Sequence, residues 1–498
     1  MTLAALYVLL AVGAGVVLIS VGAAKLAARL GMPVLLAFLC VGLLLGQDVA
    51  GVPFDDAALA QALGLAALAL ILVEGGLTTT FSDIRTVLAP ASALSTIGVL
   101  VSVAVTAAAA RLLLQIDWQI ALLLGAIVSS TDAAAVFSVL RTVPLPRQLS
   151  GLIEAESGLN DAPTFLLVAA LSTTTLPHLS PLPLAVSMLV QLIAGGLIGI
   201  AVGAAAARLL RRLTLPASGL HPIATVASGI LAFAVAGLAQ TSGFLAAYLA
   251  GLVLGNAGLP HRRVTRSVAQ GLGWIAQIGL FVMLGLLATP TELPSAIVPA
   301  LVIGTALLLL ARPASVAVSL TPFRVPWREQ VFLSWAGLRG AVPVVLATVP
   351  VVAAAPGSDQ VFNIVFVLVV VFTIIQAPTL PTLARLLRLT PPHIGLDLQV
   401  ELAPLDTMDA DLIHVTIEPG SRLHGVYLTE LRLPPPAAAT LIVRGDDTFV
   451  PDAHTRLHTG DELVVLTTPH VREATEQRLR AVARAGRLAS WFGDTGRR

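Results

Sequence analysis

Long apolar runs, separated by short charged or Pro/Gly-rich breaks, fill roughly the first 390 residues of the chain. A membrane core of about 30 Å needs roughly 20 apolar residues in a helix. Cutting the chain at its breaks predicts thirteen membrane-spanning helices, at residues 5–30, 33–48, 58–79, 88–114, 119–141, 149–174, 183–207, 221–239, 242–258, 267–288, 294–319, 329–354 and 360–387. Residues 1–390 are therefore expected to form an all-α polytopic membrane domain.

The pattern changes near residue 397, where short β-rich runs alternate with Gly, Asp and Pro turns and charge becomes ordinary for a soluble protein. This predicts a small cytoplasmic α+β domain at residues 397–470. A basic, helix-like tail follows at 471–498. The tail is expected to be a solvated terminal helix, with a membrane-surface contact as the alternative.

Composition and loop charge support this organisation. The chain of 498 residues is 56% hydrophobic and 11% charged, where soluble proteins carry about 25%. The single cysteine, Cys40, excludes a disulfide framework and a cysteine-based metal site. Loops after odd-numbered spans hold sixteen Lys and Arg residues, Arg312 among them, whereas loops after even-numbered spans hold only Arg111. This predicts a multi-pass protein of the cytoplasmic (inner) membrane, with its N-terminus outside and its C-terminus in the cytoplasm.

Five ionisable residues lie too deep in the spans to reach a span end: Glu74, Asp132, Glu156, Asp161 and Arg339. A charge at the centre of a span is costly, so such residues usually face a cavity or pair with one another. They make a transport or proton-relay site the default hypothesis.

The stretch SSTDAAAVF at 129–137 interrupts an apolar run with polar residues. We expect the helix to unwind here, exposing carbonyls near Thr131 to a cation, while Asp132 offsets the positive end of a half-helix. The alternative is an ordinary helix N-cap at a span boundary. A second break is expected near Pro343, flanked by Gly337 and Gly340, as in transporters built from inverted repeats.

The stretch SGLNDAPTF places Ser157, Asn160 and Asp161 on one helix face, followed by Pro163, which weakens the hydrogen-bond ladder beside a cavity. A lone Asp161 can hold either a monovalent cation or a proton, as an exchanger requires. The neutral Asn160 favours one-for-one electroneutral exchange. A purely structural ion pair for Asp161 is the alternative.

Two further deep residues have less certain partners by sequence alone. Glu74 is followed by Gly75 and Gly76, which allow close helix approach, so it either joins the ion site or reaches cytoplasmic water. Arg339 needs a buried acid, and Glu156 is the natural candidate for a structural ion pair.

At these residues the sequence resembles the monovalent cation/proton antiporters, in their electroneutral NhaP-like branch. The resemblance covers residues 1–390 and rests on four motifs: VEGGL at 73–77, SSTDAAAVFSVLR at 129–141, EAESGLNDAP at 154–163 and GLRGAVP at 337–343. It implies crossed broken helices, K⁺ or Na⁺ held by Asp161, Ser157, Thr131 and Glu74, an Asn160–Asp161 pair on the ion-binding helix, and a Glu156–Arg339 ion pair. It also implies a homodimer.

One departure from the family pattern concerns the cation. The common Thr-Asp-Pro reads Thr131, Asp132, Ala133 here, which looks like the potassium/proton sub-branch with a C-terminal TrkA-C (RCK-C) domain. Residues 400–468 resemble such a domain, without the nucleotide-binding half that often precedes it, so NAD sensing is not expected. A small regulatory ligand or pH remains open for this domain.

The expected function is electroneutral exchange of K⁺ for H⁺, with Na⁺/H⁺ exchange as the alternative. No cofactor and no nucleic-acid partner are expected, only the transported ions and membrane lipid. A cation channel gated by the tail domain is the alternative from another class, but no TVGYG-like filter is present in the sequence. An enzyme is not expected, because no HExxH or paired catalytic cluster occurs.

Overall fold

The chain folds into two compact units, Met1–Pro391 and Pro392–Arg498, which are described separately. The computed structural model describes residues 2–29, 32–52, 54, 56–132, 135–136, 139, 145–174, 176, 180–213, 216–217, 219–389, 400–405, 410–418, 420–445, 447–468 and 470–489. Ala133, whose identity distinguishes the expected sub-branch, lies outside these residues. The division into units falls close to the change of sequence character near residue 397.

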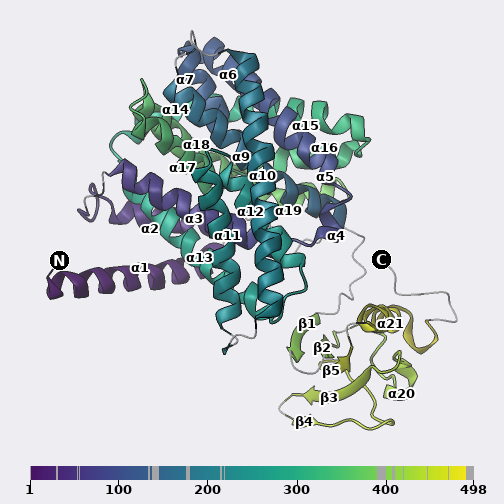
Figure 1. The fold of residues 1–498 in the computed structure, drawn as a ribbon. Helices are drawn as coiled ribbons and strands as arrows, with labels where there is room; N and C mark the ends of the chain where they lie inside the picture. The colour runs from purple at the N-terminus through teal and green to yellow at the C-terminus, as the bar shows by residue number, and fades with distance from the viewer. Residues whose placement is uncertain are drawn as a thin grey trace. The chain divides into compact units, whose positions relative to one another are not determined.

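The regular elements described in the first unit are all helical (Figure 1). The helices are α1 (Leu3–Arg29), α2 (Val34–Leu45), α3 (Ala57–Thr78), α4 (Phe81–Ile84), α5 (Leu88–Ala93), α6 (Val99–Leu114), α7 (Trp118–Ile127), α9 (Arg147–Thr173), α10 (Pro181–Arg212), α11 (Leu220–Leu238), α12 (Gly243–Asn256), α13 (Arg262–Leu287), α14 (Leu293–Ala306), α15 (Arg312–Leu320), α16 (Trp327–Ala336), α17 (Ala341–Val352), α18 (Ser358–Gln376) and α19 (Leu380–Leu386). Short turns link several of them: the π-helical η1 (Leu94–Gly98) and η3 (Leu307–Ala311), and the 3₁₀ turns η4 (Thr321–Phe323) and η5 (Ala377–Thr379).

The predicted spans coincide with these helices or with consecutive helices that continue one another. By length and composition alone, eight of the described helices can cross a membrane, or nine if the bent pair α16 and α17 is one span. The remaining predicted spans fall on the shorter apolar helices α2, α7 and α12 and on α9, which carries charged residues. Outward-facing side chains such as Leu182, Leu189 and Leu197 on α10 are 58–75% exposed, as expected for a surface that lipid covers. The chain is thus a multi-pass membrane protein.

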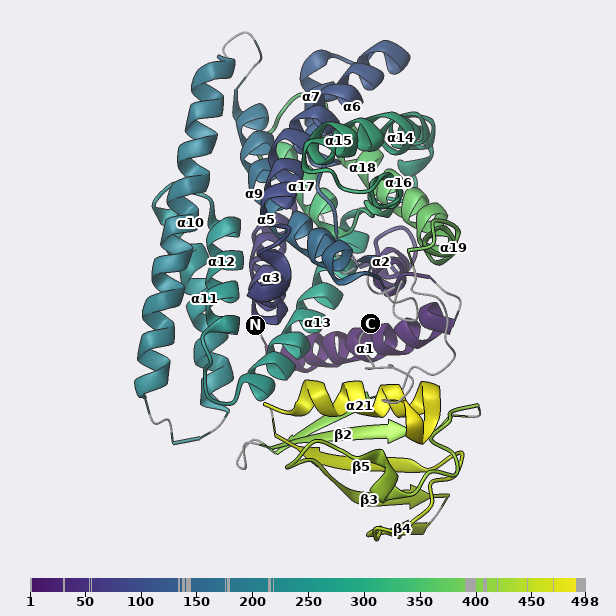
Figure 2. The same cartoon turned by 90° about the vertical axis from the view of Figure 1, so that its right-hand side faces the viewer.

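Packing divides most of these helices into two bundles. The flanking bundle consists of α2, α3 and α10 to α13, and the crossing bundle consists of α5 to α7, α9 and α14 to α18. Figure 2 shows α10, α11 and α12 side by side on one flank, with α14, α16 and α18 on the other. The bundles meet where α3 packs on α17 and where α12 packs on α9.

Glycines bring the helices of the flanking bundle into close contact. A Cβ atom at Gly251 or Gly255 of α12 would collide with the backbone of α3, at Val73 and Leu77 respectively. On the other side of α12, a Cβ at Gly199 of α10 would collide with the backbone of Ala246. Small residues let membrane helices pack backbone to backbone, where dispersion contacts stabilise them in the absence of water. The flanking bundle is therefore tightly fastened around α12.

The second unit is an antiparallel sheet covered by a helix. Strands β1 (Val400–Leu405), β2 (Ala410–Thr416), β3 (Ala438–Arg444), β4 (Asp447–Phe449) and β5 (Glu462–Thr467) form a sheet of order β1-β2-β5-β3-β4. The helical elements are α20 (Leu428–Leu431), α21 (Arg472–Ala485) and the 3₁₀ turn η6 (Gly486–Leu488). Leu479 and Val482 of α21 are buried with Ile413 and Val465 of the sheet. The expectation of a solvated terminal helix was therefore wrong for α21, because one face of it completes the core of this unit.

A bidentate ion pair braces the same unit. Arg444 donates from Nε and Nη2 to the two carboxylate oxygens of Asp461, each at 2.8 Å. Burial alone would raise the pKa of Asp461, but the hydrogen bonds from Arg444 and from the His458 backbone N–H outweigh it, and the net pKa lies below the ordinary value. The pair therefore stabilises the fold above the unfolded carboxyl pKa of about 3.9 and loses this contribution only as the pH falls through the lower folded pKa. It is formed throughout the neutral range.

Candidate functional site

The chain leaves the helical conformation directly after α7. Residues 128–132 are not helical, whereas Ala135 and Val136 are. The polar residues Ser129, Ser130 and Thr131 occupy this break, as the sequence indicated. Backbone N–H and C=O groups in this break lack the regular hydrogen bonds of a helix. Inside a membrane protein, such groups need a polar cavity or another protein segment as a partner.

A second break supplies that partner. Helix α16 ends at Ala336 and α17 begins at Ala341, with a bend of 53° between them. The backbone N–H of Asp132 donates to the carbonyl of Leu338 at 3.0 Å, so the two breaks cross. A Cβ at Gly340 would collide with the Asp132 carboxylate, which explains why glycine occupies this position.

Opposite charges lie at the ends of the interrupted helices. The Arg339 guanidinium donates to the carbonyl of Ser130 at 2.8 Å, just beyond the C-terminal end of α7. The Asp132 carboxylate accepts from the N–H of Ala135, a helical residue, at 3.2 Å. Both charges offset helix dipoles that the breaks leave inside the membrane. Asp132 thus accepts from the N–H three residues further on, as a helix N-cap does, and it lies at the crossing of the two breaks.

Helix α9 presents the predicted ion-binding residues to the crossing. Ser130 Oγ donates to Asp161 Oδ1 at 2.6 Å. Ser157 Oγ donates to the Thr131 carbonyl at 3.0 Å, and Asn160 Nδ2 donates to Thr131 Oγ1 at 2.6 Å. Residues spaced i, i+3 and i+4 thus meet the break from one helix face.

Pro163, which was expected to weaken the hydrogen-bond ladder, does not break α9. The helix continues through Pro163 to Thr173. The irregular backbone that serves the site therefore belongs to the two crossing breaks, and α9 is a continuous wall beside them.

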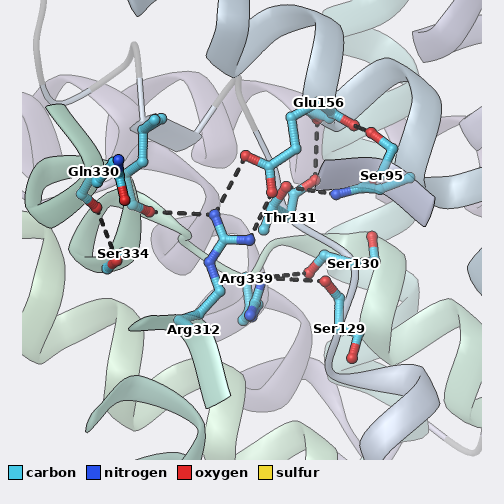
Figure 3. A network of polar contacts seen from close by, with 12 residues as sticks. Ser95, Ser129, Ser130, Thr131, Glu156, Arg312, Gln330, Ser334 and Arg339 are labelled. Atoms are coloured by element: carbon cyan, nitrogen blue, oxygen red, sulfur yellow. Dashed lines mark hydrogen bonds and ion pairs between the residues drawn. The ribbon is translucent and has the colours of Figure 1, made fainter. Parts of the chain in front are cut away.

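The expected ion pair between Glu156 and Arg339 was wrong. Glu156 pairs with Arg312, whose Nη1 lies 2.6 Å from Oε1 and whose Nη2 lies 3.2 Å from Oε2 (Figure 3). Arg312 had been assigned to a loop, but α14, η3 and α15 continue as one run and bury it to 4% exposure. Arg339 points instead to the carbonyls beside Ser129 and Ser130 (Figure 3). The guanidinium within hydrogen-bonding distance of Glu156 is that of Arg312. The Arg339 guanidinium donates to backbone carbonyls instead.

A cavity of about 430 Å³ lies between the two bundles and reaches the crossing. Five predicted residues line it: Glu74, Thr131, Asp132, Ser157 and Asp161. Glu74 comes from α3 in the flanking bundle, and its side chain lies against Gly273 of α13. Asn160 does not line the cavity, and it acts through its hydrogen bond to Thr131. The cavity therefore joins acids from both bundles.

Several polar residues of this site had no predicted role in ion binding. Ser130, expected only as part of the break, is hydrogen-bonded to Asp161, and Tyr248, Gln270 and Gln277 are among the residues that line the cavity. The two glutamines lie seven residues apart on α13, a helical spacing that could have marked a polar face. Tyr248 carried no such signal, and its ring packs against Gly158, where a Cβ would lie 2.5 Å from the ring.

A second cavity, of about 240 Å³, lies at the other end of α13. Asp48, Glu292 and Asp359 are among the residues that line it. Helix α13 contributes Gln270, Gln277 and Phe281 to the first cavity and Leu286 and Leu287 to the second. The two cavities thus approach the middle of the unit from opposite ends of one helix.

Buried acids at a crossing of two broken helices, reached by a cavity between two bundles, define an ion-coupled membrane carrier. The chain belongs to the sodium/hydrogen exchanger family, whose transmembrane model matches residues 16–386. The TrkA-C domain model matches residues 412–480. The family resemblance and the nature of the tail domain are confirmed.

Similar proteins agree with this assignment. The K(+)/H(+) antiporter NhaP of Alkalimonas amylolytica is 41% identical over 403 residues, which cover 80% of this chain and 68% of that protein. The K(+)/H(+) antiporter NhaP2 of Shewanella baltica is 34% identical over 494 residues, covering 97% of this chain and 85% of that protein. The solved structure of the sodium proton antiporter MjNhaP1 from Methanocaldococcus jannaschii has a TM-score of 0.67 at 20% identity and covers 77% of this chain and 99% of its own. This likeness confirms the fold.

Proposed function

We propose that the protein is an electroneutral antiporter that exchanges K⁺ for H⁺ at Asp161. The observation that carries the proposal is the placement of Asp161, a 5% exposed carboxylate that lines the cavity beside the two helix breaks. Ser157, the backbone near Thr131 and Glu74 supply oxygens to the same cavity, and hard monovalent cations prefer oxygen ligands. A proton on Asp161 removes the charge that holds the cation, so the two ions compete.

Charge bookkeeping around the crossing supports a one-for-one exchange. Arg312 and Arg339 contribute two positive charges, while Asp132, Glu156 and Asp161 contribute three negative charges. With all five ionised the sum is −1, from two positive and three negative groups. One K⁺ or one H⁺ at Asp161 offsets this single negative charge at the crossing, so the two loaded forms carry the same charge there.

The proposed cycle moves the crossing bundle against the flanking bundle. In this structure Asp161 faces the first cavity, and the second cavity lies at the opposite end of α13. A rocking or elevator-like displacement would re-expose Asp161 to the other side, as in carriers with crossed broken helices. The close, glycine-mediated packing of the flanking bundle favours a rigid scaffold against which the crossing bundle moves. We expect a homodimer interface to immobilise this scaffold.

Potassium is the proposed cation, and sodium is the alternative. Two relatives with 34–41% identity are named K(+)/H(+) antiporters, and one of them matches this chain over 97% of its length, tail domain included. The solved neighbour is named a sodium proton antiporter, and at 20% identity it informs only the fold. Ligand type does not separate the two ions, because both prefer oxygen.

The proposal places the protein in the cytoplasmic (inner) membrane, with the N-terminus outside and the TrkA-C domain in the cytoplasm, following the Lys/Arg asymmetry of the loops. The TrkA-C domain is proposed to regulate exchange through a small ligand or pH. Transport is the whole activity proposed, without an enzymatic reaction or a resident cofactor.

Everted membrane vesicles test this function. Respiration acidifies their interior, a pH-sensitive dye reports the gradient, and KCl or NaCl is then added. We expect K⁺ to release protons from vesicles that contain the protein and not from vesicles that lack it. A response to Na⁺ alone would assign the sodium alternative, and a response to neither cation would refute the antiporter assignment.

A further inference from the structure

Helix α13 turns one face, which carries Gln270 and Gln277, toward the cavity. Gln270, Gln277 and Phe281 line the cavity, and a Cβ at Gly273 would lie 3.4 Å from Glu74 Cγ. These positions recur every three or four residues, as one face of a helix requires. Nearer the start of α13, Arg266 Nε donates to the Leu77 carbonyl at the end of α3, at 3.3 Å. This face therefore forms one wall of the cavity along its depth.

Gln277 and Asp161 line the same cavity from different bundles: Gln277 lies on α13 of the flanking bundle and Asp161 on α9 of the crossing bundle. The Tyr248 ring packs against Gly158 of α9, and the Glu74 side chain lies against Gly273 of α13. Gln277 lies four residues beyond Gly273, about 6 Å along α13. Asp161 lies three residues beyond Gly158, about 4.5 Å along α9.

The side-chain amide of Gln277 has no hydrogen-bond partner among the residues that the structure describes. Three other glutamines of the same unit are satisfied by protein: the side-chain amides of Gln119, Gln330 and Gln376 each donate to a backbone carbonyl at 2.8–2.9 Å. An amide on a membrane helix is costly unless something polar meets it. For Gln277 that partner must come from the cavity, as water or as the transported ion.

We propose that the side-chain oxygen of Gln277 is a ligand that the flanking bundle contributes to the transported cation. The inference rests on the proposed exchange at Asp161 and extends it to a residue that determines specificity. A neutral amide oxygen adds a ligand without adding charge, so one K⁺ or one H⁺ still offsets the single negative charge at the crossing. A larger, weakly hydrated cation such as K⁺ gains most from an extra weak-field oxygen.

The test uses the full-length protein in liposomes, with K⁺-driven and Na⁺-driven proton movement measured by an internal pH dye. Gln277→Met keeps the length of the side chain, removes its oxygen, and suits a membrane helix. We expect the K⁺ concentration for half-maximal exchange to rise by about tenfold. The maximal rate should stay within about twofold, and the ratio of K⁺ to Na⁺ affinity should fall. Gln277→Asn keeps a neutral amide oxygen on a shorter side chain and should raise half-saturation less than Gln277→Met does.

Gln191→Met is the matched control, because Gln191 lies on α10 of the flanking bundle, donates to Ser187 Oγ at 3.0 Å and is not among the residues that line either cavity. It should leave half-saturation unchanged. Equal half-saturation in Gln277→Met and Gln191→Met would overturn the role of Gln277 while leaving exchange intact. A rise in Gln277→Asn as large as the rise in Gln277→Met would also overturn it. Absence of exchange by the unaltered protein would instead refute the proposed function itself.

Discussion

At the scale of single residues, the pair of Glu156 and Arg312 shows how the interior tolerates charge. Both side chains are 5% exposed, and the two guanidinium nitrogens reach both carboxylate oxygens. Removing one member leaves the other buried and unpaired, which is more costly than the net contribution of the pair. Arg339 is held differently, by backbone carbonyls at the end of α7.

Arg312→Gln should therefore destabilise the membrane unit by about 3–5 kcal/mol. Thermal unfolding in detergent, followed by tryptophan fluorescence, measures the effect. Arg324→Gln is the control, because Arg324 is exposed, and its change should stay within about 0.5 kcal/mol. A double-mutant cycle should show coupling of Glu156 with Arg312. Stronger coupling of Glu156 with Arg339 would contradict the observed pairing.

Helical spacing alone was enough to predict that Ser157, Asn160 and Asp161 share one helix face. In the structure Ser157 and Asp161 line the cavity, and Asn160 donates a hydrogen bond to Thr131, which also lines it.

The partner of Glu156 was missed because Arg312 was predicted to lie in a loop, and which arginine meets Glu156 depends on where distant helices pack. Tyr248 was missed because a single tyrosine in a span carries little signal until a cavity is seen beside it, whereas the spacing of Gln270 and Gln277 could have marked a polar face.

At the scale of elements, the crossing depends on the absence of a side chain at Gly340. A Cβ at this position would overlap the Asp132 carboxylate, which itself accepts from the N–H of Ala135. The polar and glycine-rich stretches near 131 and 340 were enough to predict both breaks. That α9 stays helical through Pro163 was not predictable, because proline interrupts a helix only where the neighbouring packing allows it.

Gly340→Ala should push Asp132 out of place and lower the exchange rate on the order of 100-fold, since small misplacements at a working site have effects of this size. Gly271→Ala is the matched control, because no atom lies within 4 Å of a Cβ at that position of α13. Exchange in liposomes and the yield of inserted protein are measured for both. Unchanged exchange in Gly340→Ala would show that the contact with Asp132 does not position the site.

At the scale of the whole molecule, the chain combines a membrane unit with a soluble unit that has its own core. Each charged residue that lines the first cavity belongs to the membrane unit. The Arg444–Asp461 pair in the soluble unit stays formed at neutral pH, because the pKa of Asp461 lies below its ordinary value. The soluble unit is therefore a separate module that can influence exchange without supplying its chemistry.

Removing residues 397–498 should accordingly retain exchange and change its regulation. We expect K⁺-driven proton movement in the truncated protein, with an altered dependence on cytoplasmic pH or small ligands. The measurement compares the pH profile of exchange for full-length and truncated protein at equal amounts in the membrane. Complete loss of exchange by a correctly inserted truncated protein would show that the soluble unit is essential to the transport cycle.

The most direct test of the central claim replaces the proposed ion-binding carboxylate. Purified protein and its Asp161→Asn variant are reconstituted in equal amounts into liposomes that contain a pH dye, and a K⁺ gradient is imposed. Glu473→Gln, at an exposed position of α21, serves as a control for loss of one carboxylate. The account predicts rapid K⁺-driven proton movement in the unaltered protein and in Glu473→Gln, and none above empty liposomes in Asp161→Asn. Proton movement by Asp161→Asn at the rate of the unaltered protein would contradict it.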